Sequence, residues 1–166
     1  MKKLITISLL ILSLALCLSA CNVSYRDDAT SKEVADKMLG SVSIDGGCDS
    51  TDSDYVSLEF PSAGTVESSV SDWYIYASKS TVTVDEFGVF HVKSGQDVNA
   101  VKKAVEEYVQ YMQLKLEVYL QTYDPAETVK LENAEVFVCG NYVIYTMLSE
   151  NDTAAVKSAA EDLLKE

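Results

Sequence analysis

Three stretches of the chain repeat apolar residues every three or four positions, which is the spacing of one face of an amphipathic α-helix. The first follows Thr30 and Glu33, which have the form of a capping box. The second and clearest follows a cap at 94–97, and the third is capped by Asn151 or Asp152. The positions predicted to lie on the apolar faces are Val34, Ala35, Met38 and Val42 in the first stretch, Val101, Val105, Tyr108, Met112, Leu116 and Tyr119 in the second, and Val156, Ala159, Ala160, Leu163 and Leu164 in the third.

Four shorter stretches are rich in aromatic and β-branched residues, as β-strands are. Residues 73–77 and 87–92 flank a polar connection, and residues 135–139 and 142–148 flank a Gly-Asn dipeptide that tolerates positive φ. Each pair predicts a β-hairpin. Between the first helix and the first strand, residues 45–72 are rich in Ser, Gly and Asp, and they predict a long irregular segment that contains a strand or a helical turn.

The order of these elements is αββαββα. Because the strands arrive as hairpins and not as βαβ units, they predict an antiparallel sheet. The apolar stripes of the helices have to cover that sheet. We therefore predict an α+β fold, a two-layer sandwich in which an antiparallel sheet of two β-hairpins carries the helices on one face. Residues 31–166 are long enough for one domain with a single core.

The start of the chain has the pattern of a secretory signal peptide. Lys2 and Lys3 precede an apolar run at 4–18, and the small residues Ser19 and Ala20 follow it. The run is shorter than the roughly 20 residues that span a bilayer. We therefore predict that residues 1–20 are removed and do not contribute to the fold.

Leu18, Ser19, Ala20 and Cys21 resemble the lipobox of bacterial lipoproteins, in which the cysteine receives a diacylglyceryl group before the signal is cut. The resemblance implies signal cleavage after Ala20 and lipid attachment at Cys21. Because several acyl chains anchor a protein stably, we expect a domain on the extracytoplasmic face of the cell membrane, with the polar residues 21–30 as a short tether. The alternative is an ordinary signal peptide with an incidental cysteine.

The composition narrows the range of partners. Residues 1–20 carry two lysines and no acid, so their removal shifts the formal net charge from −13 to −15. Such a charge repels phosphate backbones, and we expect no nucleic-acid partner. Of the remaining cysteines, Cys48 lies in a polar loop and Cys139 in a strand. Export would permit a disulfide between them, but a buried strand cysteine is commonly a small apolar residue, and we favour two free thiols.

No pattern in the sequence indicates a catalytic centre, a metal site or a cofactor. His91 is the only histidine and the cysteines are isolated, so we predict no zinc site. The serine-hydrolase elbow, S-x-x-K, the phosphate-binding P-loop and the dinucleotide fingerprint are absent. The acidic stretch at 45–54 offers oxygen atoms, but its spacing does not match a D-x-D-x-D-G calcium loop, which favours a solvated loop.

Five residues are candidates for binding. Tyr74 and Tyr76 share one face of a predicted strand, and their amphipathic rings suit a cleft for a sugar or a peptide. Asp85 and Glu86 stand at the entrance of the next strand, and Tyr123 follows the long helix. Each also has a structural interpretation. In that interpretation the two strand tyrosines pack on the sheet, and the two acids lie in a loop. The four residues after Tyr123, D-P-A-E, form a capping box that starts a short helix, and Tyr123 is the hydrophobic staple of that helix.

Several motifs occur together in a characteristic order: the lipobox, residues 84–90, the long helix with its glutamines and tyrosines, residues 123–127 and the hairpin at 140–143. Together they resemble the small lipoproteins of Gram-positive bacteria that carry the domain of unknown function DUF4358. The resemblance covers roughly residues 31–150, and the Phe87-Gly88 pair departs from the small or aliphatic residues of the family. It implies a lipid-anchored extracytoplasmic domain with no assigned activity and no catalytic residues to transfer.

These patterns lead to one functional hypothesis and one alternative. We expect a lipid-anchored, non-enzymatic binding or accessory domain that meets the membrane through its N-terminal lipid and contacts an envelope protein, a peptide or a glycan. The alternative is an unrecognised cell-envelope hydrolase that uses Asp85 and Glu86. The two differ in geometry, because a hydrolase needs carboxyl groups that converge in a concave pocket.

Overall fold

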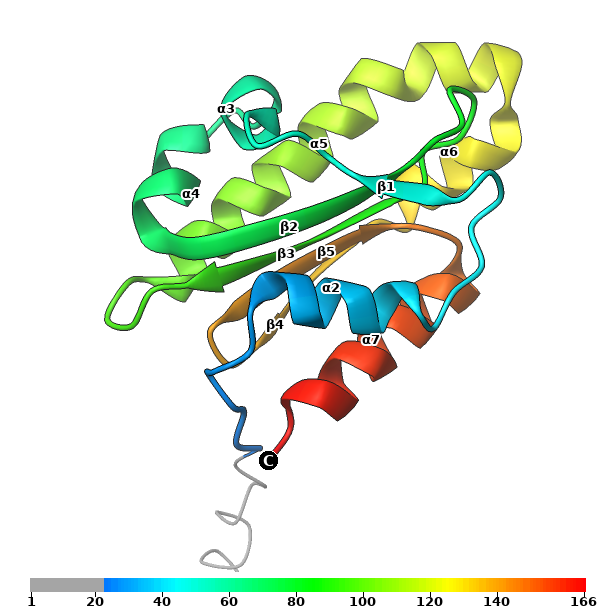
Figure 1. Cartoon of the computed structure of the whole chain (residues 1–166). Helices are drawn as coiled ribbons and strands as arrows, with labels where there is room; N and C mark the ends of the chain where they lie inside the picture. The colour runs from blue at the N-terminus through cyan, green and yellow to red at the C-terminus, as the bar shows by residue number, and fades with distance from the viewer. Residues whose placement is uncertain (1–22) are drawn as a thin grey trace, which may run out of the picture.

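The computed structural model describes residues 23–166 and contains a five-stranded antiparallel sheet (Figure 1). The strands are β1 (Cys48–Ser50), β2 (Val70–Ser78), β3 (Glu86–Val92), β4 (Glu135–Cys139) and β5 (Tyr142–Met147). Their order across the sheet is β1-β2-β3-β5-β4. Ala20 and Cys21, the residues predicted for signal cleavage and lipid attachment, lie outside the described residues.

Both predicted hairpins are present. β2 pairs with β3 and β4 pairs with β5, each in antiparallel fashion. Gly140, in the turn between β4 and β5, has a φ of 59°, a conformation that glycine adopts readily. β3 and β5 also pair, so the two hairpins share one sheet. The prediction of an α+β fold with an antiparallel sheet is confirmed.

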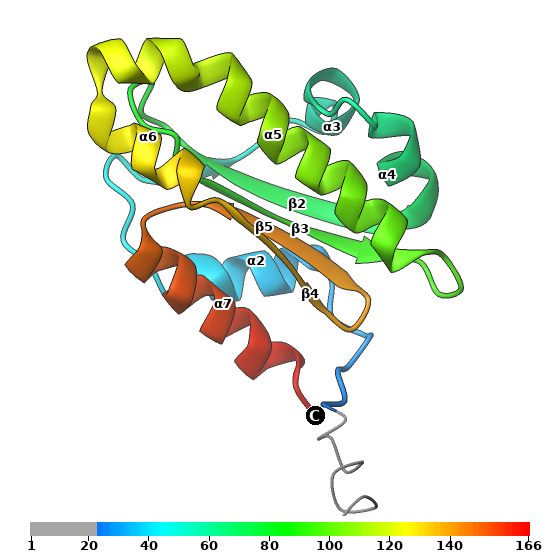
Figure 2. The same ribbon diagram turned by 180° about the vertical axis from the view of Figure 1, so that it is seen from behind.

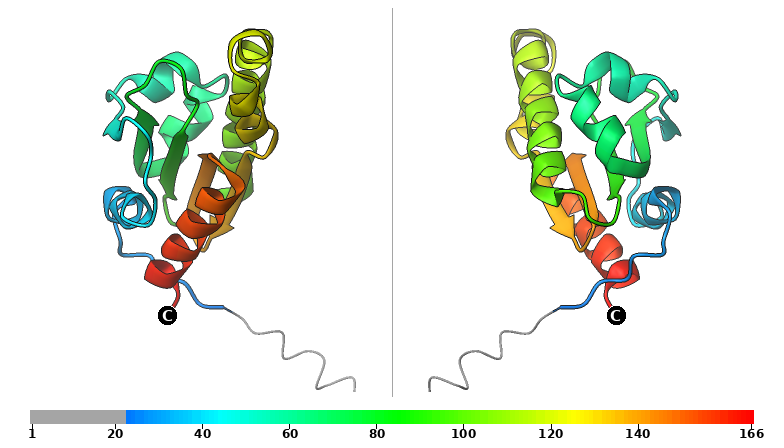
Figure 3. Two further views of the ribbon diagram at one scale, coloured as in Figure 1. Left: turned by 90° about the vertical axis from the view of Figure 1, so that its right-hand side faces the viewer. Right: turned by 90° about the vertical axis from the view of Figure 1, so that its left-hand side faces the viewer.

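The helices cover both faces of this sheet, as Figures 2 and 3 show. They are α2 (Ser31–Leu39), α3 (Tyr55–Glu59), α4 (Ala63–Ser69), α5 (Val98–Tyr123), α6 (Pro125–Glu132) and α7 (Glu150–Leu164). α2 and α7 pack on one face, and α3 to α6 lie on the other. The sheet is thus the middle of three layers and does not carry its helices on one face as predicted. In the described part of the chain, no helix is long and apolar enough to cross a membrane.

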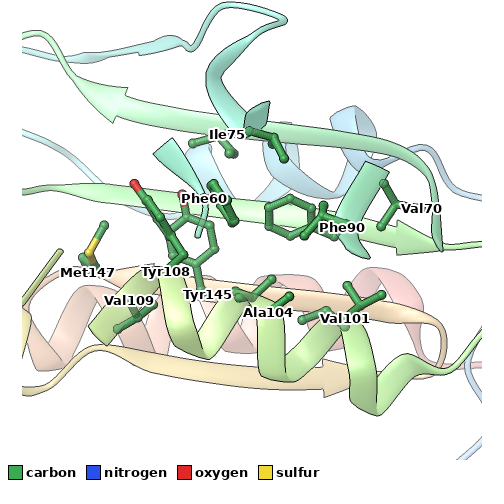
Figure 4. Packing of buried hydrophobic residues seen from close by; sticks show 14 of the residues in the cluster. Phe60, Val70, Ile75, Phe90, Val101, Ala104, Tyr108, Val109, Tyr145 and Met147 are labelled. Atoms are coloured by element: carbon green, nitrogen blue, oxygen red, sulfur yellow. The ribbon is translucent and has the colours of Figure 1, made fainter. Parts of the chain in front are cut away.

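The two central strands explain this difference. Phe87 and Val89 of β3 face α2 and α7, whereas Phe90 and Val92 face α5, and all four are fully buried. β5 is likewise buried along its whole length. A strand that is apolar on both sides needs cover on both sides. Figure 4 shows how α5 provides this cover on one face, with its buried side chains packed on Phe90 and its neighbours.

The segment at 45–72, which was predicted to be irregular, contains β1, α3 and α4. The two helices are short, and they bury Val56 and Val66 in the same core as α5. Helices of five and seven residues are marginal on their own, so their order depends on this burial and not on local propensity. Helices this short therefore leave no clear three-to-four-residue repeat of apolar residues in the sequence.

The helix starts follow local capping chemistry. Thr30 and Glu33 form the predicted capping box at the start of α2. The cap of α7 is Ser149, two or three residues before the predicted caps Asn151 and Asp152, because the Ser149 side chain accepts a hydrogen bond from the N–H of Asp152. A hydroxyl at this position satisfies one of the free N–H groups of the first turn.

Residues 24–30, predicted as part of the tether, pack against the domain. The N–H of Glu166 donates to the carbonyl of Ser24 at 3.1 Å. Further along, Ala29 is buried and its carbonyl accepts a 2.7 Å hydrogen bond from the Tyr142 hydroxyl. The packed part of the chain therefore begins near Ser24, beside the C-terminus (Figure 1).

Candidate functional site

A buried carboxyl group surrounded by three tyrosines lies between the sheet and α5. Tyr108 and Tyr145 both donate hydrogen bonds to Oε1 of Glu86, the first at 2.7 Å. Tyr55 donates to Oε2 at 3.0 Å, and its hydroxyl lies 2.9 Å from that of Tyr108. We call these four residues the Glu86 cluster. They come from α3, β3, α5 and β5, so the cluster joins elements that are distant in the sequence.

Strand register and helix periodicity bring the cluster together. Glu86 begins β3 and shares a face with Gly88, which lies opposite Tyr145 on β5. Because Gly88 has no side chain, the Tyr145 ring occupies the space above it. Tyr108 belongs to the core stripe of α5, and its ring stacks on Phe60 with centroids 3.9 Å apart (Figure 4). The rings thus hold the hydroxyls toward the carboxyl group.

Burial governs the protonation of the cluster. It raises the pKa of Glu86, and the three tyrosine hydrogen bonds, which favour the carboxylate, offset this only in part. Burial also raises the pKa of Tyr55, Tyr108 and Tyr145, and the nearby Glu86 charge adds to the effect. The tyrosines therefore stay neutral and act as donors. Glu86, Tyr108 and Tyr145 are buried, Tyr55 is partly buried, and all four are hydrogen-bonded, which is the arrangement of a structural polar group.

Asp85 belongs to a second charged group, which ties the loop before β3 to α6. Lys130 Nζ lies 2.7 Å from Asp85 Oδ1 and 2.8 Å from Glu127 Oε1. The other oxygen of Glu127 accepts from the N–H of Val84 at 2.9 Å. Burial raises the pKa of Asp85, although Lys130 opposes it. Pro125 opens α6 as predicted, but Glu127 anchors the loop and does not close a capping box.

Tyr74 and Tyr76 lie on the other face of the sheet, against α2. The Tyr76 hydroxyl donates to Asp36 at 2.7 Å. The ammonium group of Lys32 lies 5.2 Å from the centre of the Tyr74 ring, within the range of a cation–π contact. Both tyrosines are half-buried and fasten α2 to the sheet, which agrees with their structural interpretation.

Tyr123 lies at the C-terminal end of α5 with 73% of its surface exposed, and its ring is 4.9 Å from that of Tyr119. It is therefore not packed as a staple residue in the core. The five predicted candidates therefore do not form one site. Tyr74 and Tyr76 lie together, with ring centroids 5.3 Å apart, whereas Asp85 and Glu86 belong to two different polar groups and Tyr123 lies apart from both. Asp85 ends the loop before β3, as its structural interpretation predicted, whereas Glu86 is the first residue of the strand, and both acids are buried.

The remaining reactive side chains form no metal site in residues 23–166. Cys48 and Cys139 lie on the two outer strands, roughly 19 Å apart by four strand spacings, which is too far for a disulfide. Burial raises the pKa of each thiol to about 11, so both are poor nucleophiles near neutral pH. His91 lies 2.8 Å from Asp27 and stacks on Tyr142.

An open cleft of about 590 Å³ lies between α5 and α6. It is lined by Gln110, Gln113, Leu114, Glu117, Thr128, Leu131 and Glu132. The buried Oγ1 of Thr128 has no hydrogen-bond partner within the described residues. The cleft includes neither Asp85 nor Glu86, so the predicted acids do not converge in it.

The region that builds these sites matches a known family. The family described as Domain of unknown function (DUF4358) matches residues 65–148, about half of the chain. The chain belongs to the DUF4358 family. A comparison with curated proteins and one with solved structures found no match.

The DUF4358 match runs from α4 to just past β5. It contains Glu86, Tyr108 and Tyr145, together with the Asp85–Lys130 pair, whereas Tyr55 precedes it. The resemblance predicted for residues 31–150 is thus confirmed for the part that holds most of the Glu86 cluster. The departure at Phe87-Gly88 has a physical reason, because Gly88 makes room for Tyr145.

Sequence reasoning missed the partners of both acids in this DUF4358 domain. Tyr108 was predicted only as a core position, and Tyr55, Tyr145 and Lys130 had no assigned role. One signal was available. A tyrosine within an apolar stripe buries its hydroxyl, and a buried hydroxyl needs a hydrogen-bond partner. The sequence does not say which residue that partner is.

Proposed function

We propose that this DUF4358 protein is a bacterial lipoprotein, anchored through Cys21 to the extracytoplasmic face of the cell membrane, and that its domain binds another envelope protein without catalysing a reaction. The observation that carries the binding role is an exposed apolar surface on α5 and α6. The anchor rests on the lipobox at 18–21, which lies outside the described residues.

Exposed apolar side chains gather on the C-terminal half of α5 and on α6. Six of the ten large hydrophobic residues exposed in the described structure lie there. Leu114 and Val118 are 75% and 76% exposed and lie one helical turn apart, so they form one stripe. Apolar surface of this kind commonly marks a contact with another protein. We call these residues the α5–α6 surface: Tyr111, Leu114, Val118, Tyr119, Tyr123 and Val129.

The position of this surface suits a membrane-anchored protein. Ser24 is three residues from Cys21, so a lipid on Cys21 would lie within roughly 10 Å of the packed domain. α6 and the adjoining end of α5 lie far from the C-terminus (Figures 1 and 2), beside which Ser24 packs. In the anchored protein the α5–α6 surface would point away from the bilayer, toward other envelope components.

The acids considered for a hydrolase do not suit catalysis. Glu86 is enclosed by three tyrosines, and Asp85 is paired with Lys130. Neither side chain has a free face on a cleft where a substrate bond could lie, since the α5–α6 cleft includes neither. A binding role fits this arrangement better. Turnover of an envelope substrate that disappears in Asp85→Asn would contradict the proposal.

Replacing Cys21 by alanine is expected to release nearly all of the protein from the membrane fraction and to abolish labelling with a radioactive fatty acid. Alanine has no thiol to carry the lipid, and without acyl chains the acidic domain has no stable anchor. Membrane fractionation with immunoblotting measures the release. Cys17→Ala is the matched control, and its labelling should be unchanged. If fatty-acid labelling persists in the Cys21→Ala protein, lipid attachment at Cys21 is excluded.

A photo-reactive phenylalanine analogue at Val118 is expected to give a discrete crosslinked product in intact cells, with at least about tenfold more product than the same analogue at Leu58. Leu58 is the matched control because it is 78% exposed but lies on α3, away from the α5–α6 surface. Immunoblotting measures both yields. Equal yields at the two positions, or no product at Val118, would contradict a specific protein contact.

A further inference from the structure

We propose that the free edge of β2 binds an extended, positively charged peptide segment, which adds to the sheet as a further strand beside Trp73. The site lies at the edge of the sheet and is separate from the α5–α6 surface. It depends neither on the lipid anchor nor on the partner proposed above.

β1 covers only part of the outer edge of β2. Its three residues pair with residues 76–78, and the last backbone bond runs from the N–H of Thr51 to the carbonyl of Ile75 at 3.0 Å. β2 continues for five residues beyond this point, to Val70. Within residues 23–166, that part of β2 has β3 on one side and no strand on the other.

Strand geometry determines which backbone groups are free. The Ile75 carbonyl points outward, because it accepts from Thr51 on the β1 side. The direction of the backbone N–H and C=O groups alternates along a strand. The backbone N–H and C=O of Trp73, two residues away, therefore also point outward. No backbone hydrogen bond found among residues 23–166 engages Trp73 on that side. Its N–H and C=O form a donor–acceptor pair that another extended chain can satisfy.

A groove accompanies this free edge. It has a volume of about 540 Å³, within the size range of ligand sites, and it lies between residues 70–75 of β2, the residues that follow β1, and α4. Thr51 is at the point where β1 leaves the sheet, and its buried Oγ1 has no hydrogen-bond partner in the described structure. A peptide lying along β2 would pass Thr51, which lines the groove.

The negative charge of the groove favours a positively charged peptide. Glu67 and Asp72 line it, and no lysine or arginine does. Glu67 forms no ion pair among residues 23–166, whereas Asp72 accepts from the N–H of Ser31 at 2.7 Å and lies 3.6 Å from His91. Asp52 and Asp54 stand in the adjoining loop. Lysine or arginine side chains of an added strand would therefore meet complementary charge.

The edge carries a register shift between Val70 and Asp72 but neither of two other common blocks. Proteins commonly block an exposed strand edge with a lysine or a proline. Residues 70–75, with the sequence VSDWYI, contain neither. The free backbone pair at Trp73, the groove beside it and its acidic lining thus all favour the same ligand, an extended cationic peptide.

The test uses the full-length chain and a short acetylated peptide of alternating lysine and valine. Trp73 is the only tryptophan, so its fluorescence reports on the edge directly. We expect a saturable change in Trp73 fluorescence and slower hydrogen exchange of the Trp73 N–H. The same peptide with N-methylated amides on one edge keeps its charge but loses backbone donors, and it should bind about tenfold more weakly or worse. A glutamate–valine peptide should not bind.

Protein variants sharpen this test. Glu67→Gln should weaken the lysine–valine peptide by roughly three- to tenfold, because the groove loses its unpaired carboxylate. Glu132→Gln makes the same charge change in the α5–α6 cleft and should leave the affinity unchanged. Equal binding of the N-methylated peptide would overturn the proposal, as would an unchanged Trp73 signal. Self-association of the chain through this edge would assign it to a second copy and likewise overturn it.

Discussion

Replacing Glu86 by alanine is expected to lower the free energy of unfolding by about 4 kcal/mol. The carboxyl group accepts from Tyr108 and Tyr145, both fully buried, and from Tyr55. Its removal leaves the hydroxyls of Tyr108 and Tyr145 without this acceptor inside the core, and each unsatisfied buried group costs about 1–3 kcal/mol. The truncated side chain also leaves a cavity. Urea denaturation followed by circular dichroism measures the change.

Glu106→Ala is the matched control for this loss. It removes the same side-chain atoms, but Glu106 lies on α5, is partly exposed and, among residues 23–166, forms an ion pair only with Lys102, at 2.8 Å. Such a pair contributes less than about 1 kcal/mol, so the control should stay close to the wild type. If Glu86→Ala proves no less stable than Glu106→Ala, the Glu86 cluster does not hold the core together.

The variant Glu86→Gln tests the raised pKa of Glu86 through the pH dependence of stability, because glutamine has the shape of glutamate but does not titrate. Burial raises the pKa of Glu86 above its ordinary value of 4.5, so the folded domain holds this proton more tightly than the unfolded chain. The resulting stabilisation is complete below that ordinary value and is lost as the pH rises through the folded-state pKa. The unfolding free energy of the wild type minus that of Glu86→Gln should therefore fall as the pH rises above the ordinary value of 4.5, until the pH has passed the folded-state pKa. A difference that does not change with pH would contradict the raised pKa.

Replacing Gly88 by alanine is expected to cost about 3 kcal/mol, although the change adds one methyl group. A Cβ atom at Gly88 would overlap the Tyr145 ring and lie 2.8 Å from Cγ1 of Ile75. Neither neighbour can move easily, since both are buried and Tyr145 is held by its bond to Glu86. Thermal unfolding measures the loss, and the near-ultraviolet circular dichroism of the tyrosines should change with it.

Gly64 is the matched control for Gly88, because it has free space beside its Cα atom. It lies in α4, and a Cβ atom there would meet no atom within 4 Å. Gly64→Ala should leave the stability unchanged or raise it by up to about 1 kcal/mol, because alanine favours the helix. If both glycine variants behave alike, close packing at Gly88 is not the reason for its glycine.

The destabilisation expected for Glu86→Ala and that expected for Gly88→Ala both arise in the Glu86 cluster, which also affects the proposed binding surface. The Glu86 cluster joins α3 and α5 to the central strands, so its integrity sets the geometry of α5. α5 in turn carries the α5–α6 surface at its far end. If Glu86→Ala loses the crosslink at Val118, the reason would thus be that α5 has moved, because Glu86 itself does not contact the partner.

The local pattern of residues was enough to predict the main elements and the fold class. The three-to-four-residue repeats of α2, α5 and α7 and the two hairpins arise from neighbours in the sequence, and their positions are confirmed. The order of the motifs also identified the DUF4358 family. Such features are encoded within a few residues of one another, which is why a single sequence reveals them.

Only the tertiary structure decided how these elements are combined. The helices cover both faces because β3 and β5 are adjacent and buried on both sides, which depends on the pairing of two hairpins distant in the sequence. Glu86 finds Tyr55, Tyr108 and Tyr145 across separations of 22 to 59 residues. No local periodicity encodes such contacts, since they depend on strand register and on the direction of one helix face. The free edge at Trp73 has the same origin, because it follows from where β1 stops.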